Sequence, residues 1–163
     1  SMLGTNDHIG QAYTVQSSKT GCQVFLSTLD QGQWQWLHFD FFDQTVQEVP
    51  IKGRTEHPFI LDGQLFWLQE DTNQHITCLN RQGEPQWYLK ERQSIHSVHP
   101  YNDHQFVLIE SNGETFTVNV VNIEDGHLAS KPLQLPNDEV HTLRMLDGRF
   151  WIQTATQAYS IFC

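Results

Sequence analysis

Short apolar runs separated by turn residues follow one another along the chain, and no long window has the period of a helix. The clearest unit runs from Leu61 to Leu89 and contains two turn signals, Asp62-Gly63 and Gln82-Gly83. The runs between these turns are rich in aromatic and β-branched residues, which is typical of strands. The pattern predicts strand, turn, strand, turn, strand.

The same unit returns along the chain with a period of roughly 40–45 residues. The segment that begins at Asp62 aligns with segments that begin at Asp103 and Asp147, and more weakly with one upstream. The second turn keeps the same period, since Gly83 is matched by Gly126. Four-stranded repeats of this length are typical of β-propeller blades. We therefore predict an all-β fold of four propeller-like blades, arranged as a closed small propeller or an open arc.

We expect a single domain with repeats at about residues 11–53, 54–93, 94–136 and 137–163. Pro85 and Pro132 fall in predicted fourth strands, and proline is confined to sheet edges, so the fourth strand should be the outer edge of each blade. The last repeat ends after three strands. Residues 3–10 could supply its missing strand, or a second copy of the chain could do so in a homodimer.

The predicted third strand of the first repeat is apolar on both faces. By the period of two, two tryptophans and a histidine share one face and three apolar residues share the other: Trp34, Trp36 and His38, then Leu37, Phe39 and Phe41. Such a strand should be covered on both sides, as in stacked sheets. We also expect Trp67, Leu108 and Trp151 to occupy equivalent buried positions in the second strands.

The segment from Leu79 to Trp87, and more loosely the one from Val121 to Leu128, resembles the third strand, turn and fourth strand of quinoprotein-like β-propeller repeats. In those repeats a residue pair, a glycine and a later tryptophan recur. The chain is similar to WD-like blades in fold only, because the Gly-His and Trp-Asp pairs of WD blades and the double glycine of kelch blades are absent. Quinone-binding enzymes of this group need a larger ring of blades, so the resemblance implies the fold and no cofactor.

Charge limits the partners that we expect. The chain has 19 acidic and 9 basic residues and a formal net charge of −10. This charge disfavours nucleic acid and anionic membranes as partners. It favours a basic protein or peptide as the partner, or it serves only to keep the protein soluble. The three cysteines have no paired spacing, which indicates free thiols in a reducing compartment such as the cytoplasm. We expect neither a transmembrane helix nor a signal peptide, and Ser1-Met2 reads as an expression remnant, with a trimmed leader left open.

Histidines are numerous, and the densest group is His96, His99 and His104. Residues three apart on a strand point to opposite faces, so His96 and His99 should not converge on one ion unless the strand is broken. Pro100 could break it. We expect no metal site, and the absence of cysteine pairs agrees.

Catalytic motifs are also missing from the sequence. No nucleophile elbow, phosphate-binding glycine loop or zinc-binding helix occurs. Asp62, Asp103 and Asp147 occupy matching turns and are interpreted as turn residues. We therefore do not expect an enzyme.

One set of residues suggests a binding face. In a propeller, the loops from second to third strands and those between blades emerge on one side, and here they are rich in carboxylates. One exposed tryptophan would add contact area to these carboxylates. The predicted binding residues are Asp30, Trp34, Glu70, Asp71, Glu110, Glu114 and Asp138. They form either a solvated acidic rim or a docking face.

We therefore predict a non-enzymatic protein-binding module with an acidic face for a basic partner. One version is an inhibitor or immunity-type protein that neutralises a basic toxin or nuclease. The alternative is a carbohydrate- or small-molecule-active propeller with a site in the central channel. Convergent carboxylates or histidines in the first strands, near residues 11–19, 55–61, 94–101 and 139–146, would favour the alternative.

Overall fold

A computed structural model describes residues 9–17, 21–28, 34–50, 56–129, 131–136, 140–146, 149–154 and 157–161. Every regular element in these residues is a β-strand. This confirms the predicted all-β class.

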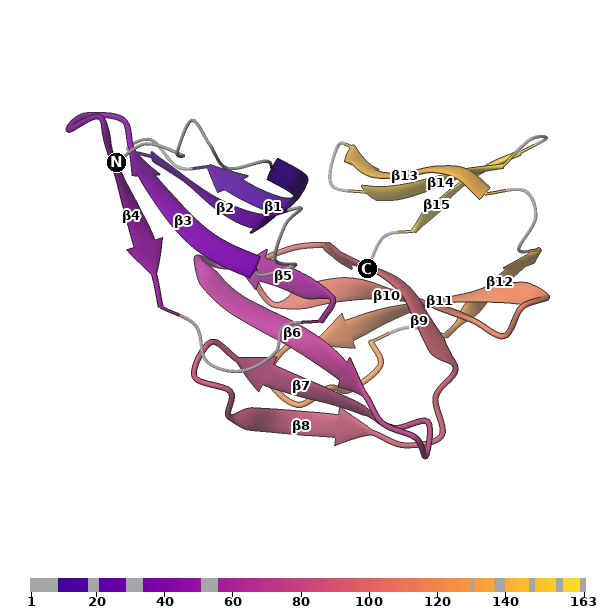
Figure 1. The fold of residues 1–163 in the computed structure, drawn as a ribbon. Helices are drawn as coiled ribbons and strands as arrows, with labels where there is room; N and C mark the ends of the chain where they lie inside the picture. Colours follow the sequence, from indigo (N-terminus) through magenta and orange to yellow (C-terminus); the bar gives the residue numbers. More distant parts are fainter. Residues whose placement is uncertain are drawn as a thin grey trace. The chain divides into compact units, whose positions relative to one another are not determined.

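The strands form four antiparallel sheets, each with its strands in chain order (Figure 1). The first sheet contains β1 (Ile9–Ser17), β2 (Gly21–Thr28), β3 (Trp34–Asp40) and β4 (Thr45–Val49). The second contains β5 (Pro58–Leu61), β6 (Gln64–Glu70), β7 (Ile76–Asn80) and β8 (Pro85–Leu89). The third contains β9 (Ser94–Pro100), β10 (Gln105–Ser111), β11 (Thr115–Asn122) and β12 (Leu133–Pro136). The fourth contains β13 (Val140–Leu146), β14 (Arg149–Thr154) and β15 (Ala158–Ile161).

This arrangement confirms four blade-like sheets. Pro85 begins β8 and Pro132 directly precedes β12, and both strands lie at the edges of their sheets. Within the described ranges, the last sheet has three strands. Residues 3–10 were one of the two predicted sources of the missing fourth strand of this sheet. Of these, Ile9 pairs instead with Thr28 of β2, and residues 3–8 lie outside the described part of the chain.

The two repeating turn signals form turns with left-handed backbone. Asp62 and Gly63 have φ values of 49° and 73° and link β5 to β6, as in a two-residue hairpin turn with both φ angles positive. In the second turn, the Asn80 side-chain Oδ1 accepts hydrogen bonds from the backbone N–H groups of Gln82 and Glu84, each 3.0 Å long. Local turn chemistry therefore sets where the strands end.

Backbone contacts divide the chain into two compact units, residues 1–68 with 79–84 and residues 69–78 with 85–163. In the first unit, Trp36 of β3 packs in a buried cluster with Ile60, Leu65, Trp67 and Leu79. Large apolar side chains from the first two repeats thus build this core, and their burial is the main stabilising contribution.

Strand β3 ends one residue earlier than predicted. The Asp40 Oδ1 atom accepts hydrogen bonds from the backbone N–H groups of Phe42 and Asp43, 2.9 and 3.0 Å long, which turns the chain at Asp40. Phe41 therefore does not extend the apolar face of the strand. It lies in the turn with 56% of its surface exposed, and Phe42 is 78% exposed.

In the second unit, β10 is covered on both faces. Val107 and Ile109 belong to a buried cluster with Phe150 and Ile152 of the fourth sheet. On the other face, the Phe106 ring stacks on Trp87 of β8, with 6.0 Å between ring centroids and 11° between planes. The expectation that a strand apolar on both sides is covered twice holds for this strand.

The tryptophan of the resembling segment ties β8 to the turn after β11. Trp87 Nε1 donates a 2.6 Å hydrogen bond to the Ile123 carbonyl oxygen. Its ring also lies against Gly126, where an added Cβ would be 2.5 Å from a ring carbon. Gly126 has a φ of 74°, so this position needs glycine for its backbone as well as for its space.

The predicted equivalence of the second strands needs one correction. Trp67 and Leu108 are buried at the fourth position of their strands, as expected. Counted from Asp147 in the same way as from Asp62, the matching residue in the last repeat is Ile152, which is fully buried, whereas Trp151 is half-buried. The prediction for Trp151 was wrong because a shift of one residue moves a side chain to the other face of a sheet.

Candidate functional site

The structure describes the side chains of only some of the predicted binding residues. Asp30 and Asp138 lie outside the described residues, and Trp34 begins β3 with a side chain that is also outside them. The remaining four all belong to the second unit: Glu70, Asp71, Glu110 and Glu114.

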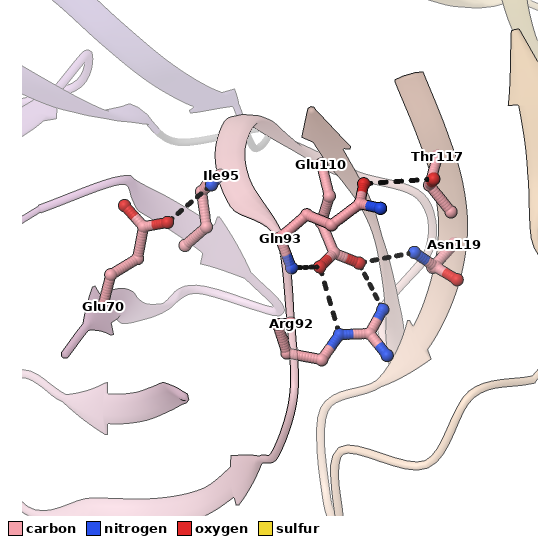
Figure 2. Close-up of polar contacts among 7 residues, drawn as sticks. All are labelled: Glu70, Arg92, Gln93, Ile95, Glu110, Thr117 and Asn119. Atoms are coloured by element: carbon pink, nitrogen blue, oxygen red, sulfur yellow. Dashed lines mark hydrogen bonds and ion pairs between the residues drawn. The ribbon is translucent and has the colours of Figure 1, made fainter. Parts of the chain in front are cut away.

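Glu110 does not lie in an exposed loop. It is the sixth residue of β10, and only 1% of its surface is exposed. Its carboxylate accepts hydrogen bonds from the Gln93 backbone N–H at 2.9 Å and from Asn119 Nδ2 at 2.8 Å (Figure 2). Its inclusion in an acidic rim is therefore corrected, because the side chain is buried and bonded within the sheet.

Arg92 completes the surroundings of Glu110. Its Nε donates a 3.1 Å hydrogen bond to Oε2, and its Nη2 forms an ion pair with Oε1 (Figure 2). A buried carboxylate is retained only with a partner of opposite charge and with its lone pairs satisfied. The charges of Arg92 and Glu110 cancel each other. The hydrogen bonds from Arg92 and Gln93 to Glu110 hold the chain segment before β9 against β10.

A polar cavity of about 170 Å³ lies beside this ion pair. Its walls come from the end of β6, the β6–β7 turn and the segment before β9: Glu70, Asp71, Gln74, His75, Ile76, Arg92, Gln93 and Ser94. The Arg92 backbone N–H donates a 2.7 Å hydrogen bond to the Gln74 carbonyl oxygen. This bond ties the turn to the segment that carries Arg92.

Asp71 shapes the turn at the cavity. Its Oδ1 accepts hydrogen bonds from the backbone N–H groups of Asn73 and His75, 2.8 and 3.0 Å long. The hydrogen bond from the His75 backbone is the main cause of the lowered pKa of Asp71. Desolvation opposes it, and the hydrogen bond from the Asn73 backbone lowers the pKa further. Asp71 is therefore a carboxylate at neutral pH, and its side chain is exposed.

Glu70 connects the end of β6 to the start of β9. Its Oε1 accepts a 2.6 Å hydrogen bond from the Ile95 backbone N–H (Figure 2). Because Glu110 cancels the charge of Arg92, the carboxylates of Glu70 and Asp71 leave the cavity with a net negative charge. Such a cavity suits a cationic group.

Glu114 lies apart from the cavity walls. It is exposed in the turn between β10 and β11, where its backbone N–H donates a 2.8 Å hydrogen bond to Asn112 Oδ1. The structure thus brings together Glu70 and Asp71 at one cavity with Glu110 buried beside Arg92, and it places Glu114 in a separate turn.

Sequence reasoning missed Arg92 and Asn119 as partners of a carboxylate. A signal for the burial of Glu110 was present, since this residue directly continues the apolar run from Phe106 to Ile109. A charged residue at the end of such a run in a central strand needs a partner. The identity of that partner depends on contacts between segments that are distant in the chain.

Two histidines of β9 converge on one hydroxyl group. His96 Nδ1 is 3.1 Å and His99 Nε2 is 2.9 Å from Ser97 Oγ. The register of β9 with β10 shifts here, since Ile109 pairs with Ser97 but Glu110 pairs with Ile95, so His96 is an extra residue in a β-bulge. The strand is thus broken at His96 and not at Pro100, and the expectation that the rings point apart was wrong.

Burial lowers the pKa of His99 to about 4, with a smaller contribution from the neighbouring His96. Among the residues that the structure describes, no group of three or more His, Cys, Asp or Glu side chains could hold a metal ion. In the same ranges, Cys22 and Cys78 are free thiols, and burial raises the pKa of Cys78. No helix in the described ranges is long and apolar enough to cross a membrane.

Comparison with known proteins bears on the fold. No protein-family model and no curated protein matches the chain. Its structure is similar to acylaminoacyl peptidase in complex with Z-Gly-Gly-Phe-chloromethyl ketone, with a TM-score of 0.52 and 9% identity over 96% of this chain and 32% of that chain. Pyrococcus horikoshii acylaminoacyl peptidase gives a TM-score of 0.50 and 10% identity over 96% and 32% of the two chains. The β-propeller domain of the Trilobed protease from Pyrococcus furiosus gives 0.47 and 10% identity over 93% and 57%.

The fold is β-propeller-like. The repeated sheets and the likenesses to the two acylaminoacyl peptidases agree on this point. At such low identities the likeness shows the fold alone. The chain spans about a third of the length of the two peptidases, 32% in each case.

Proposed function

We propose that this chain is a non-enzymatic protein-binding module whose exposed carboxylates dock a basic protein or peptide. The observation that carries the proposal is the polar cavity at Glu70 and Asp71. Its one lining arginine, Arg92, forms an ion pair with Glu110, and the carboxylates of Glu70 and Asp71 give the cavity its negative character.

The chemistry of these carboxylates supports a cationic partner. Asp71 is an ionised carboxylate at neutral pH, and the turn hydrogen bonds that lower its pKa also hold it in place before a partner arrives. A fixed carboxylate loses little side-chain freedom on binding, which lowers the cost of association. The net charge of −10 adds long-range attraction for a basic protein and repels nucleic acid.

In its specific form, the proposal is an inhibitor or immunity-type protein of the cytoplasm that neutralises a basic toxin or nuclease. Free cysteines suit a reducing compartment, and an acidic inhibitor can bind a basic enzyme through charge complementarity. A homodimer formed through the edge of β15 is a second type of association that the same chain could support.

A comparison of two variants in a pull-down from native extract tests the proposal. The double variant Glu70→Gln with Asp71→Asn removes both charges and keeps the oxygen acceptors of Ile95, Asn73 and His75. Glu124→Gln, in the exposed turn after β11, removes one charge elsewhere and is the control.

The proposal predicts basic proteins that are retained by the natural protein and by Glu124→Gln and are lost from the double variant. Mass spectrometry identifies them. Retention of the same proteins by all three forms would contradict a role for this cavity.

The alternative function, a carbohydrate- or small-molecule-active propeller, is favoured by one observation. His96 and His99 converge on Ser97 in β9, the first strand of the third sheet. Titration with neutral mono- and disaccharides, followed by histidine ring signals in NMR spectra, tests it. Shifts of the His96 and His99 signals would favour this alternative, and unchanged signals would count against it.

A further inference from the structure

The His96–Ser97–His99 cluster has a donor geometry that the acidic docking site does not use. A ring nitrogen of His96 and one of His99 lie 3.1 and 2.9 Å from the same hydroxyl oxygen, that of Ser97. Each ring also lies next to an aromatic side chain. The centroid of His96 lies 4.5 Å from that of Phe116, and the centroid of His99 lies 5.1 Å from that of Phe150.

We propose that His96 Nδ1, His99 Nε2 and the Ser97 hydroxyl form a binding site for a borderline divalent transition-metal ion, with Cu²⁺ and Zn²⁺ as the best fits. Imidazole is the side chain that these ions select, and Cu²⁺ binds nitrogen donors most strongly among the first-row divalent ions. The site goes beyond protein docking and does not depend on it.

The distances require only a small adjustment. An ion at the position of the hydroxyl oxygen would lie 2.9 and 3.1 Å from the two nitrogens. This is about 1 Å longer than a Zn–N bond of about 2.0–2.1 Å. His96 is exposed, so its ring is free to move toward the ion, while Ser97 rotates to become a third ligand or to leave the site. Water would complete the coordination, as in open metal sites.

The β-bulge at His96 brings the ring nitrogens of His96 and His99 to the same hydroxyl group. In a regular strand His96 and His99 would point to opposite faces, whereas the register shift opposite Glu110 turns both toward Ser97. Bulges commonly re-aim a side chain next to a functional site. A hydroxyl that only bridges two rings would not bind metal, so metal affinity separates the two roles.

Copper titration of the metal-free protein tests the proposal. Substoichiometric Cu²⁺ should broaden the ring NMR signals of His96 and His99 before those of the other histidines. Isothermal titration with Zn²⁺ should give one site, weakened at least about ten-fold in His96→Asn, since even outer-shell changes cost 10–100-fold in affinity. His104→Asn, at an exposed histidine in the β9–β10 turn, is the matched control and should leave that affinity unchanged.

The exposed His96 carries the decisive substitution, because its change leaves the core intact. Ser97→Ala should keep Cu²⁺-induced broadening at both rings, since the nitrogens remain. Equal Zn²⁺ affinity of the natural protein and His96→Asn would overturn the proposal. It would also be overturned if His104→Asn weakened binding as much as His96→Asn, because the metal would then bind surface histidines in general.

Discussion

Glu110 and Asp71 belong to one predicted set of carboxylates, but the structure gives them opposite environments. Glu110 is 1% exposed and is bonded to Arg92, Gln93 and Asn119. Asp71 is exposed and bonded only to the backbone of its own turn among the contacts described. Both arrangements satisfy the carboxylate, but only the second leaves its charge accessible.

The difference teaches how an acidic loop pattern divides into structural and binding roles. Removing a buried carboxylate destabilises the fold, because its hydrogen-bond and ion-pair partners are left unpaired. An exposed carboxylate costs the fold little when it is neutralised, so its charge can serve a partner. Substitution of a buried carboxylate should therefore lower stability, whereas substitution of an exposed carboxylate should weaken binding.

The largest effect is expected for Glu110→Ala. Loss of this carboxylate leaves Arg92 and Asn119 with unpaired donors in a buried site, so the free energy of unfolding should fall by about 3–5 kcal/mol. Urea denaturation measures the change. The double variant Arg92→Met with Glu110→Leu should recover most of the loss, since it removes both charges. A single variant as stable as the natural protein would show that the ion pair is not structural.

A smaller loss is expected for Asn119→Leu. The side chain is fully buried and donates a 2.8 Å hydrogen bond to Glu110, so its replacement should cost about 1–3 kcal/mol in the same assay. Thr117→Val is a matched control, because its hydroxyl makes a longer bond of 3.4 Å to Gln93. Equal losses in both variants would argue against a special role of the Glu110 network.

Asp71 should separate turn geometry from charge. Asp71→Asn keeps an oxygen acceptor for the Asn73 and His75 N–H groups and should leave the urea midpoint nearly unchanged. Asp71→Ala removes the acceptor and should lower the midpoint by less than Asn119→Leu does. If Asp71→Asn lowers the urea midpoint as much as Asp71→Ala does, the charge of Asp71 and not its turn hydrogen bonds determines its contribution to stability.

The smallest effect is expected for Glu114→Gln. This side chain is exposed in a turn whose backbone N–H groups donate hydrogen bonds to the side chains of Ser111 and Asn112, so stability should change by about 0.5 kcal/mol or less. A thermal melt checks it. A larger loss would mean that Glu114 has a structural partner and belongs with Glu110.

The fold was predictable because its determinants are local. Asp62-Gly63 and Gly126 occupy positive φ angles at turns, and such residues stand out in a sequence. Their repetition, together with two-sided apolar strands such as β10, predicts blade-like sheets. Trp151 was misplaced because period-two patterns do not tolerate an alignment error of one residue.

The candidate site was less predictable because it depends on contacts between distant segments. Arg92 reaches Glu110 only when the segment before β9 lies against β10. The bulge at His96 likewise exists only in the pairing of β9 with β10. No periodicity along the chain encodes either contact.

The association rate of a basic partner tests the central claim most directly, namely that exposed and not buried carboxylates serve binding. Once a partner is identified, its rate should be measured at low salt and near 0.1 M salt, where screening acts over about 10 Å. The natural protein should associate faster at low salt, and Glu70→Gln with Asp71→Asn should be slower and less dependent on salt, whereas Glu124→Gln should resemble the natural protein. Equal rates for the natural protein and the double variant at both salt concentrations would contradict the account.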